Sequence, residues 1–144
     1  MEPAAPGRTL PRRALQALWL WLPVAAHMLL IFTLSSASSL PAPPGRFSDK
    51  QAHAIAYAVL AGLICRALAG GRWAGLTAGR AVAAALLAVA YGVTDEWHQS
   101  FVPGRQSETA DLYADALGAA LGAVACFSCG IIERFRRRGA AAAR

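Results

Sequence analysis

The sequence predicts an all-α protein, an integral membrane bundle of four transmembrane helices whose N and C termini are both cytoplasmic. Hydrophobic residues make up 56% of the 144 residues and charged residues only 15%, a balance too apolar for an ordinary soluble domain. The apolar residues fall into long runs that a globular core does not require. Lysines and arginines lie mostly at the ends of these runs, where topogenic charges are found.

The first helix is expected over residues 14–34, which are 21 residues without a charge. At about 1.5 Å per residue it spans roughly 31 Å, one bilayer core. A signal peptide is the alternative, because a basic head precedes the run and small residues follow it. The run is longer than a usual h-region of about 7–15 residues, which favours an uncleaved helix. His27 within it is interpreted as a hydrogen-bonded packing residue.

The second helix is expected over residues 49–69. Ser48 precedes it as an N-cap with Gln51 three residues later, the pattern of a capping box. Gly70 and Gly71 end it. The third span is less defined, because residues 81–94 alone are too short to cross a bilayer. This helix therefore starts earlier, near residue 73, or continues through Asp95 towards residue 101.

The fourth helix is expected over residues 109–132, and a run of arginines follows it. The domain division is a disordered basic head at 1–13, a membrane domain at 14–132 and a basic tail at 133–144. Eleven Lys and Arg residues lie in the head, the middle connection and the tail, against three in the other two loops. The positive-inside rule then places both termini in the cytoplasm and the first and third loops outside.

Polar side chains concentrate at the predicted outer ends of three helices. Spacings of four residues place those of each helix on one face. The candidates are Asp49, Lys50, His53 and Tyr57 on the second helix, Asp95, Glu96 and Gln99 on the third, Arg105 in the loop, and Asp111 and Asp115 on the fourth. Below Asp115, Gly118 and Gly122 form a GxxxG motif, which lets a neighbouring helix approach closely.

Charges at bilayer depth are expensive and turn inward to pair. One interpretation is that the carboxylates pair with Arg105, Lys50 and His53 only to hold the bundle together. The favoured interpretation is an outward-facing polar pocket that takes a ligand. A third is catalysis, in which His53 acts as a general base or the carboxylates hold a divalent metal; no hydrolase or metalloprotease signature is present. The sequence predicts no cofactor and no metal, and no nucleic-acid partner, because the arginines form no aromatic-interleaved patch.

Three motifs resemble the VanZ-like membrane protein family. They read Asp49-Lys50-x-x-His53-x-x-x-Tyr57, then Asp95-Glu96-x-x-Gln99-x-Phe101-x-Pro103-Gly104-Arg105, then Asp111-x-x-x-Asp115-x-x-Gly118-x-x-x-Gly122. The family pattern usually has Asn at the position of Asp115. The resemblance implies a small helical integral membrane protein, and the founding member is associated with resistance to the glycopeptide antibiotic teicoplanin.

The combined prediction is a multi-pass protein of the bacterial inner (plasma) membrane. Its pocket is expected to bind a polar or anionic component of the cell envelope, such as an envelope precursor or an anionic head group. Arg105 and Lys50 are expected to meet the anionic group as charge-assisted donors. The alternatives are a membrane-embedded hydrolase of a lipid-linked substrate and a structural or assembly subunit.

Overall fold

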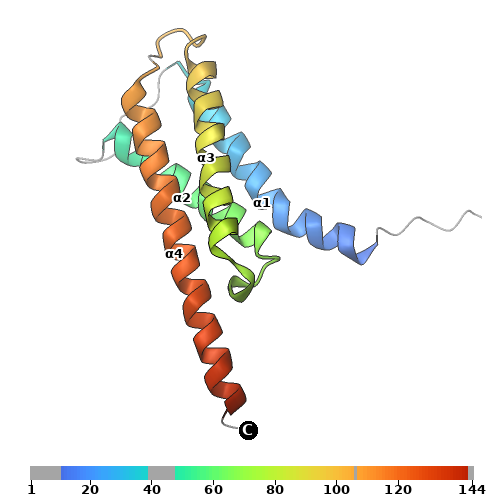
Figure 1. The fold of residues 1–144 in the computed structure, drawn as a ribbon. Coiled ribbons are helices and arrows are strands. Elements are labelled where there is room, and N and C mark those ends of the chain that lie inside the picture. Colours follow the sequence, from blue (N-terminus) through green and yellow to red (C-terminus); the bar gives the residue numbers. More distant parts are fainter. Residues whose placement is uncertain (1–10, 39–47, 106, 143–144) are drawn as a thin grey trace, which may run out of the picture.

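The computed structural model describes residues 11–38, 48–105 and 107–142, and every regular element within these ranges is helical. Figure 1 shows the four α-helices. They are α1 (Arg12–Ser35), α2 (Asp49–Leu68), α3 (Ala78–Gln99) and α4 (Thr109–Ala142), and the 3-10 turn η1 (Trp73–Gly75) precedes α3. All four helices are long and apolar enough to cross a membrane. The predicted all-α bundle with four spans is therefore confirmed.

Local signals set the ends of α2. Ser48 Oγ accepts a hydrogen bond from Gln51 N at 3.3 Å, and Gln51 Oε1 accepts one from Ser48 N at 2.9 Å. This is the capping box that the sequence predicts. Beyond the helix, Gly70 and Gly71 have φ angles of 67° and 81°, a left-handed backbone that glycine adopts without strain.

The third helix is longer at both ends than residues 81–94, but the expected start near residue 73 is wrong, because α3 begins at Ala78 after a separate 3-10 turn. The chain turns at η1, and Thr77 then caps α3 by accepting a hydrogen bond from Arg80 N at 3.3 Å. The helix continues through Asp95 and Glu96 to its last residue, Gln99. Its 22 residues are enough to cross a bilayer core, and the two carboxylates lie in its final turns.

The expectation that the fourth helix ends near residue 132 is wrong, because α4 continues to Ala142. Residues 133–142 are rich in alanine and arginine, both strong helix formers. Glu133 also accepts from Arg137 one turn further along at 2.5 Å, and Arg134 Nη1 donates to Leu76 O at 2.8 Å. At the other end of the chain, Arg12 and Arg13 belong to α1, while residues 1–10 of the predicted disordered head lie outside the described residues.

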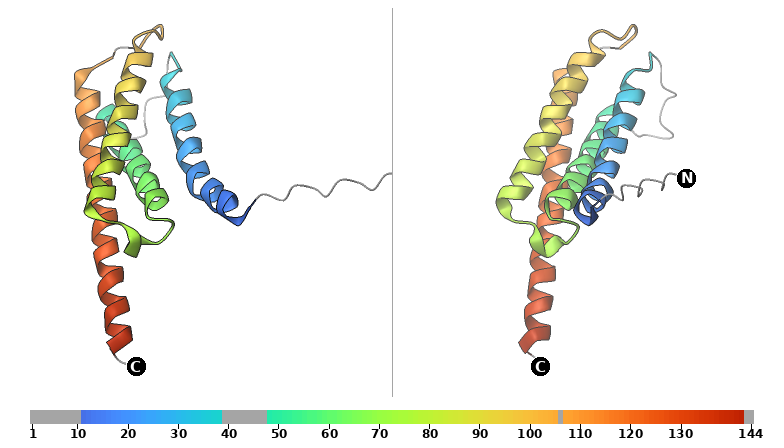
Figure 2. Two further views of the ribbon diagram at one scale, coloured as in Figure 1. Left: turned by 45° about the vertical axis from the view of Figure 1, so that its right-hand side comes forward. Right: turned by 90° about the vertical axis from the view of Figure 1, so that its right-hand side faces the viewer.

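Successive helices run in opposite directions, so the ends of α1 and α3 lie near the beginnings of α2 and α4 (Figures 1 and 2). Helix α4 packs along both α2 and α3, whereas α1 packs mainly against α2. No more than 33% of the most apolar window of any helix is buried. Large apolar side chains such as Leu86 and Val124 face outward. This outer surface fits a lipid bilayer, and the chain is a multi-pass membrane protein.

The closest helix contact joins α2 and α4 at the GxxxG motif. A Cβ atom built on Gly118 would collide with the carbonyl oxygen of Ala54, and one built on Gly122 would collide with that of Ala58. Each contact is backbone against backbone, so no side chain can rotate away. The predicted packing role of both glycines follows directly from this geometry.

We predict that Gly118→Ala destabilises the protein by about 1–3 kcal/mol, because the added methyl group forces α2 and α4 apart. Thermal unfolding of the purified protein in mild detergent measures the change. Gly139→Ala is the matched control, since a Cβ at Gly139 meets no atom within 4 Å and alanine favours the helix by about 1 kcal/mol. Equal unfolding midpoints for the two variants would show that the α2–α4 contact is not tight.

Candidate functional site

The predicted polar residues gather at one end of the bundle, where α1 and α3 end and α2 and α4 begin. Asp49 and Asp111 lie in the first turns of α2 and α4. The positive end of a helix dipole stabilises a carboxylate at that position. The same end receives the loop that contains Arg105, so all ten predicted polar residues come from four neighbouring segments.

A partly buried hydrogen bond between α2 and α4 forms the centre of the site. His53 Nδ1 donates to Asp115 Oδ1 at 2.9 Å, and Asp115 is 0% exposed. Gly92 on α3 leaves room for this carboxylate, because a Cβ there would lie 3.0 Å from Asp115 Oδ2 and 3.2 Å from Tyr57 Cε1. Three helices therefore enclose the His53–Asp115 pair.

Glu96 extends this centre towards the α3–α4 loop. Its Oε2 atom accepts from Ser107 Oγ at 2.9 Å and from Glu108 N at 3.1 Å. These two bonds tie the loop to the end of α3. One ring nitrogen of His53 and one oxygen each of Glu96 and Asp115 lie within 4.8 Å of one another, a spacing within which a metal ion can be held.

Several polar atoms in this interior have no hydrogen-bond partner among the described residues. They are Tyr57 Oη, Asp95 Oδ1, Glu96 Oε1 and Asp115 Oδ2. Each such buried atom destabilises a protein by about 1–3 kcal/mol. Three of these four atoms are carboxylate oxygens, so the unpartnered atoms in the interior are mostly acceptors.

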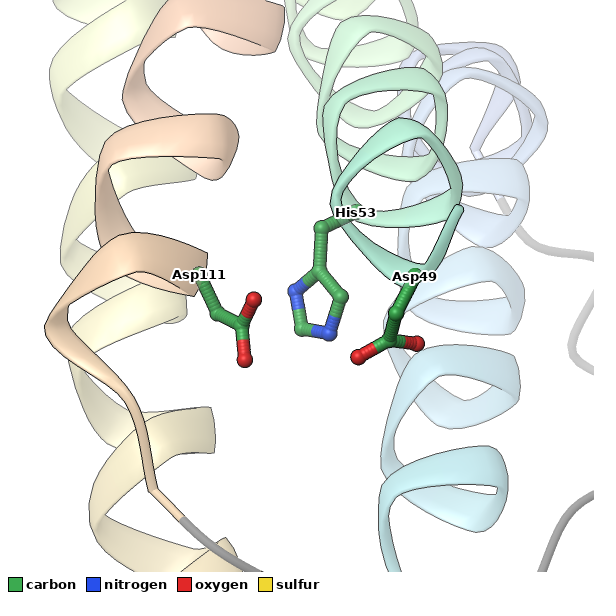
Figure 3. Close-up of side chains that lie close together, drawn as sticks. All are labelled: Asp49, His53 and Asp111. Carbon is green, nitrogen blue, oxygen red and sulfur yellow. The ribbon is translucent and has the colours of Figure 1, made fainter. Parts of the chain in front are cut away.

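A second group lies at the rim of the site. Lys50 Nζ is 2.6 Å from Glu108 Oε2 and 2.5 Å from Asp111 Oδ1. Figure 3 shows the carboxylates of Asp49 and Asp111 on either side of the His53 ring. Asp49, His53 and Asp111, which we call the outer group, also offer ligand atoms within 4.8 Å of one another. The charge of Asp111 in this group is already paired with that of Lys50.

The end of α1 closes the site on its other side. Ser35 Oγ donates to Asp95 Oδ2 at 2.8 Å, and Gln99 Nε2 donates to the same oxygen at 3.0 Å. Asp95 and Gln99 are 3% and 2% exposed. One bond from α1 and one from within α3 thus fix Asp95 in the interior.

Arg105 binds the backbone at the end of α1. Its Nε donates to Ala37 O at 3.0 Å and its Nη2 to Leu34 O at 2.8 Å. Both carbonyl groups lie at the end of the helix, where carbonyl groups lack the usual partners within the helix, and Ala37 N also donates to Leu34 O at 3.2 Å. Gly104 precedes Arg105 with a φ of 83°, the left-handed turn that brings the side chain back towards α1.

A pocket of about 120 Å³ opens beside these groups. A cavity of about 10–15 Å³ holds one water molecule, so this pocket has room for a small polar group. Six of the predicted residues line it together with Ser35 and the apolar residues Ile31, Leu34, Ala52 and Ala56. The six are Asp49, His53, Tyr57, Asp95, Gln99 and Arg105.

The structure thus brings the predicted residues together, some in ion pairs between helices and others as the lining of the pocket. Lys50 and Asp111 pair with each other, as the purely structural interpretation expects, and so do His53 and Asp115. Within the ranges that the structure describes, Arg105 forms no ion pair with a carboxylate. Sequence reasoning missed Ser35, which bonds Asp95, and Gly92, which accommodates Asp115 and shares a face of α3 with Glu96.

His27 has the packing role predicted for it, because His27 Nε2 lies 2.9 Å from Ala56 O. This hydrogen bond joins α1 to α2 below the polar site. It accounts for the one ionisable residue near the middle of the α1 span.

Comparison with known proteins agrees with the motifs and the fold. The model of the VanZ/LLP1 family matches residues 17–132, which include the whole of α2 and α3, α1 without its first five residues and α4 without its last ten. No curated protein and no solved structure matches the chain. The family match covers most of the sequence and contains every residue of the polar site, so the chain belongs to the VanZ/LLP1 family.

Proposed function

We propose that this VanZ/LLP1 protein binds the polar head group of a cell-envelope component, with an anionic group of the ligand at Arg105. The observation that carries the proposal is the state of the Arg105 side chain. It lines the pocket, and its described partners are two uncharged carbonyl oxygens. Its positive charge is not neutralised by any described carboxylate within ion-pairing distance.

The two carbonyl bonds also hold the guanidinium in place before a ligand arrives. A rigid donor loses less conformational freedom on binding than a free side chain does. Hydrogen bonds between a guanidinium and a phosphate or carboxylate are shorter and stronger than neutral ones. Arg105 is therefore suited to a phosphate or carboxylate that enters the pocket.

Lys50 does not share this role in the proposal. Its ammonium group lies between Glu108 and Asp111 and does not line the pocket. The remaining polar contacts to a ligand come from His53 and Asp49 at the opening. The apolar wall of Ile31 and Leu34 on α1 suits the lipid part of an amphipathic ligand.

The proposed orientation places this pocket on the outer side of a bacterial inner membrane. The opposite end of the bundle carries the basic residues Arg12, Arg13, Arg66, Arg72, Arg80, Arg134, Arg136, Arg137 and Arg138, which the positive-inside rule assigns to the cytoplasm. An outward-facing site can meet lipid-linked envelope precursors. The association of the family's founding member with teicoplanin resistance supports a ligand of this kind.

We predict that Arg105→Gln weakens binding of a polyprenyl phosphate at least tenfold, because the ligand loses a charge-assisted contact of about 1.5–3 kcal/mol. Native mass spectrometry of the protein in mild detergent measures this affinity against a neutral lipid. Arg80→Gln is the matched control, since Arg80 also donates to a backbone carbonyl, Gly75 O at 2.7 Å, but at the other end of the bundle.

A polyprenyl phosphate that binds wild type no better than the neutral lipid would count against the proposal. So would an equal loss in both arginine variants. The unfolding midpoint of each variant shows whether the arginine is needed only to hold α1.

We predict that a cysteine at position 101 reacts with a membrane-impermeant maleimide added outside intact cells, and that a cysteine at position 140 does not. Phe101 is 69% exposed in the α3–α4 loop, and Ala140 is exposed near the end of α4. The host protein has Cys65, Cys126 and Cys129 replaced by alanine. Labelling of position 101 only after the cells are opened would reverse the orientation.

A second candidate function, hydrolysis of a lipid-linked substrate, is favoured by the His53–Asp115 hydrogen bond. Asp115 orients the ring through Nδ1 at 2.9 Å, and His53 lines the pocket. A histidine held by a carboxylate in this way can take a proton from an attacking water, and the carboxylate stabilises the resulting imidazolium.

If the chain is such a hydrolase, His53→Gln is expected to lower turnover of a polyprenyl phosphate ester at least 100-fold while the unfolding midpoint stays within a few degrees of wild type. Release of inorganic phosphate measures the turnover. If the wild-type protein binds the ester but releases no phosphate, the hydrolase function is excluded and only the ligand-binding function remains.

A further inference from the structure

We propose that His53, Glu96 and Asp115 bind a divalent metal ion of the Mn²⁺ or Zn²⁺ class inside the bundle. The three residues come from α2, α3 and α4, and one ligand atom from each lies within 4.8 Å of the others. The proposal concerns a site behind the pocket wall. It does not depend on the envelope ligand or on the binding role of Arg105.

The first argument is the state of the two carboxylates. Glu96 is 7% exposed and Asp115 is 0% exposed. Glu96 Oε1 and Asp115 Oδ2 have no hydrogen-bond donor among the described residues. Two carboxylates this close repel each other, and burial strengthens the repulsion. A single imidazole offsets only part of that charge, whereas a divalent cation offsets all of it and satisfies the free oxygens.

The second argument is the distance between His53 and Asp115. Two ligands that lie about 2.1 Å from a metal are about 3.0 Å apart at the right angles of octahedral coordination and about 3.4 Å apart in the tetrahedral coordination typical of Zn²⁺. The separation of His53 Nδ1 and Asp115 Oδ1 is 2.9 Å. Metal binding therefore needs little movement of this pair. When Nδ1 binds the metal, the imidazole stays neutral by carrying its proton on Nε2, and the metal takes the place of the Nδ1 proton between the two residues.

The third argument is the support around the ligands. Glu96 is oriented through its other oxygen by Ser107 Oγ and Glu108 N, so Oε1 is the oxygen left for a metal. Gly92 leaves space beside Asp115 Oδ2. Ligands held by outer hydrogen bonds in this way are typical of metal sites.

The ligand set decides the class of metal. Two carboxylates suit Mg²⁺, Ca²⁺ and Mn²⁺, whereas an imidazole favours transition metals. A set of one imidazole and two carboxylates therefore favours Mn²⁺ or Zn²⁺ over Mg²⁺ or Ca²⁺.

The outer group in Figure 3 offers an access route to this site. Asp49 is exposed and faces the His53 ring from the side opposite Asp111. Lys50 already forms an ion pair with Asp111, and its ammonium group would repel a metal ion at that carboxylate. The outer group is thus less suited to hold a metal, but its exposed carboxylate can attract one towards His53.

The test is a titration of metal-free, full-length protein in lipid nanodiscs with Mn²⁺, followed by electron paramagnetic resonance of the bound ion. We expect one Mn²⁺ per chain, displaced by Zn²⁺. Glu96→Gln and Asp115→Asn are each expected to weaken binding at least tenfold, because each exchanges a charged ligand for a neutral amide. Glu133→Gln, a change of the same kind at the opposite end of the bundle, is expected to bind as wild type does.

A second measurement on wild type avoids the question of whether the variants fold. Electron spin echo modulation detects a nitrogen nucleus bound to Mn²⁺, and we expect this signal from His53. Absence of the nitrogen signal overturns the proposal, as does equal Mn²⁺ affinity in wild type and the Glu96→Gln, Asp115→Asn double variant. Arg105→Gln is expected to keep its Mn²⁺, so failure of head-group binding and failure of metal binding are separate outcomes.

Discussion

The backbone contact between α2 and α4 determines where every group in the polar site lies. Gly118 meets Ala54 and Gly122 meets Ala58, so both contacts advance by four residues and the two helices run in the same direction. This register places Asp115 beside His53, the residue before Ala54. Because both helices begin at the polar end, the positive ends of two helix dipoles lie near the acidic residues there. A cluster rich in carboxylates is tolerated partly for this reason.

The charges of the site divide into those that hold the bundle and those that remain available. Lys50 is saturated by two carboxylates at the rim, and its contribution is to the packing of α2 against α4. Arg105 has carbonyl partners, which leave its charge uncompensated. On the acidic side, Glu96 and Asp115 both lie within 4.8 Å of a ring nitrogen of His53, but only Asp115 is bonded to it. An uncompensated guanidinium and a partly compensated acidic centre therefore lie at the same end of the molecule.

Much of the fold could be predicted from sequence because it depends on local signals. The Ser48 capping box and the glycines of α4 act through neighbouring backbone, which a short motif encodes fully. The end of α4 could not be predicted in the same way. The arginines after residue 132 mark the end of the apolar span, but a helix continues into water wherever its residues favour it. The limits of a membrane span and of a helix are set by different forces.

In the candidate site, too, the features encoded by local spacing were predictable and the contacts between distant segments were not. Spacing of four residues indicated which side chains share a face, and the structure brings those faces together. The spacing could not indicate that Arg105 binds the end of α1, because backbone carbonyl groups occur at every residue and carry no sequence signal. The partner of Asp95 is similarly hidden, since Ser35 lies 60 residues away and a serine at the end of an apolar run is unremarkable.

The unequal lengths of α2 and α4 have a consequence for hydrophobic matching. The 34 residues of α4 extend about 51 Å, well beyond a core of about 30 Å, and Figure 2 shows its last turns projecting past the other helices. The 20 residues of α2 extend about 30 Å. The last ten residues of α4 carry five charges, so its apolar part ends at Ile132. The contacts of Gly118 with Ala54 and of Gly122 with Ala58 also prevent α4 from sliding along α2. The depth of the polar site is therefore set by the apolar parts of α2 and α4 together, so bilayer thickness acts on the site through this locked pair of helices.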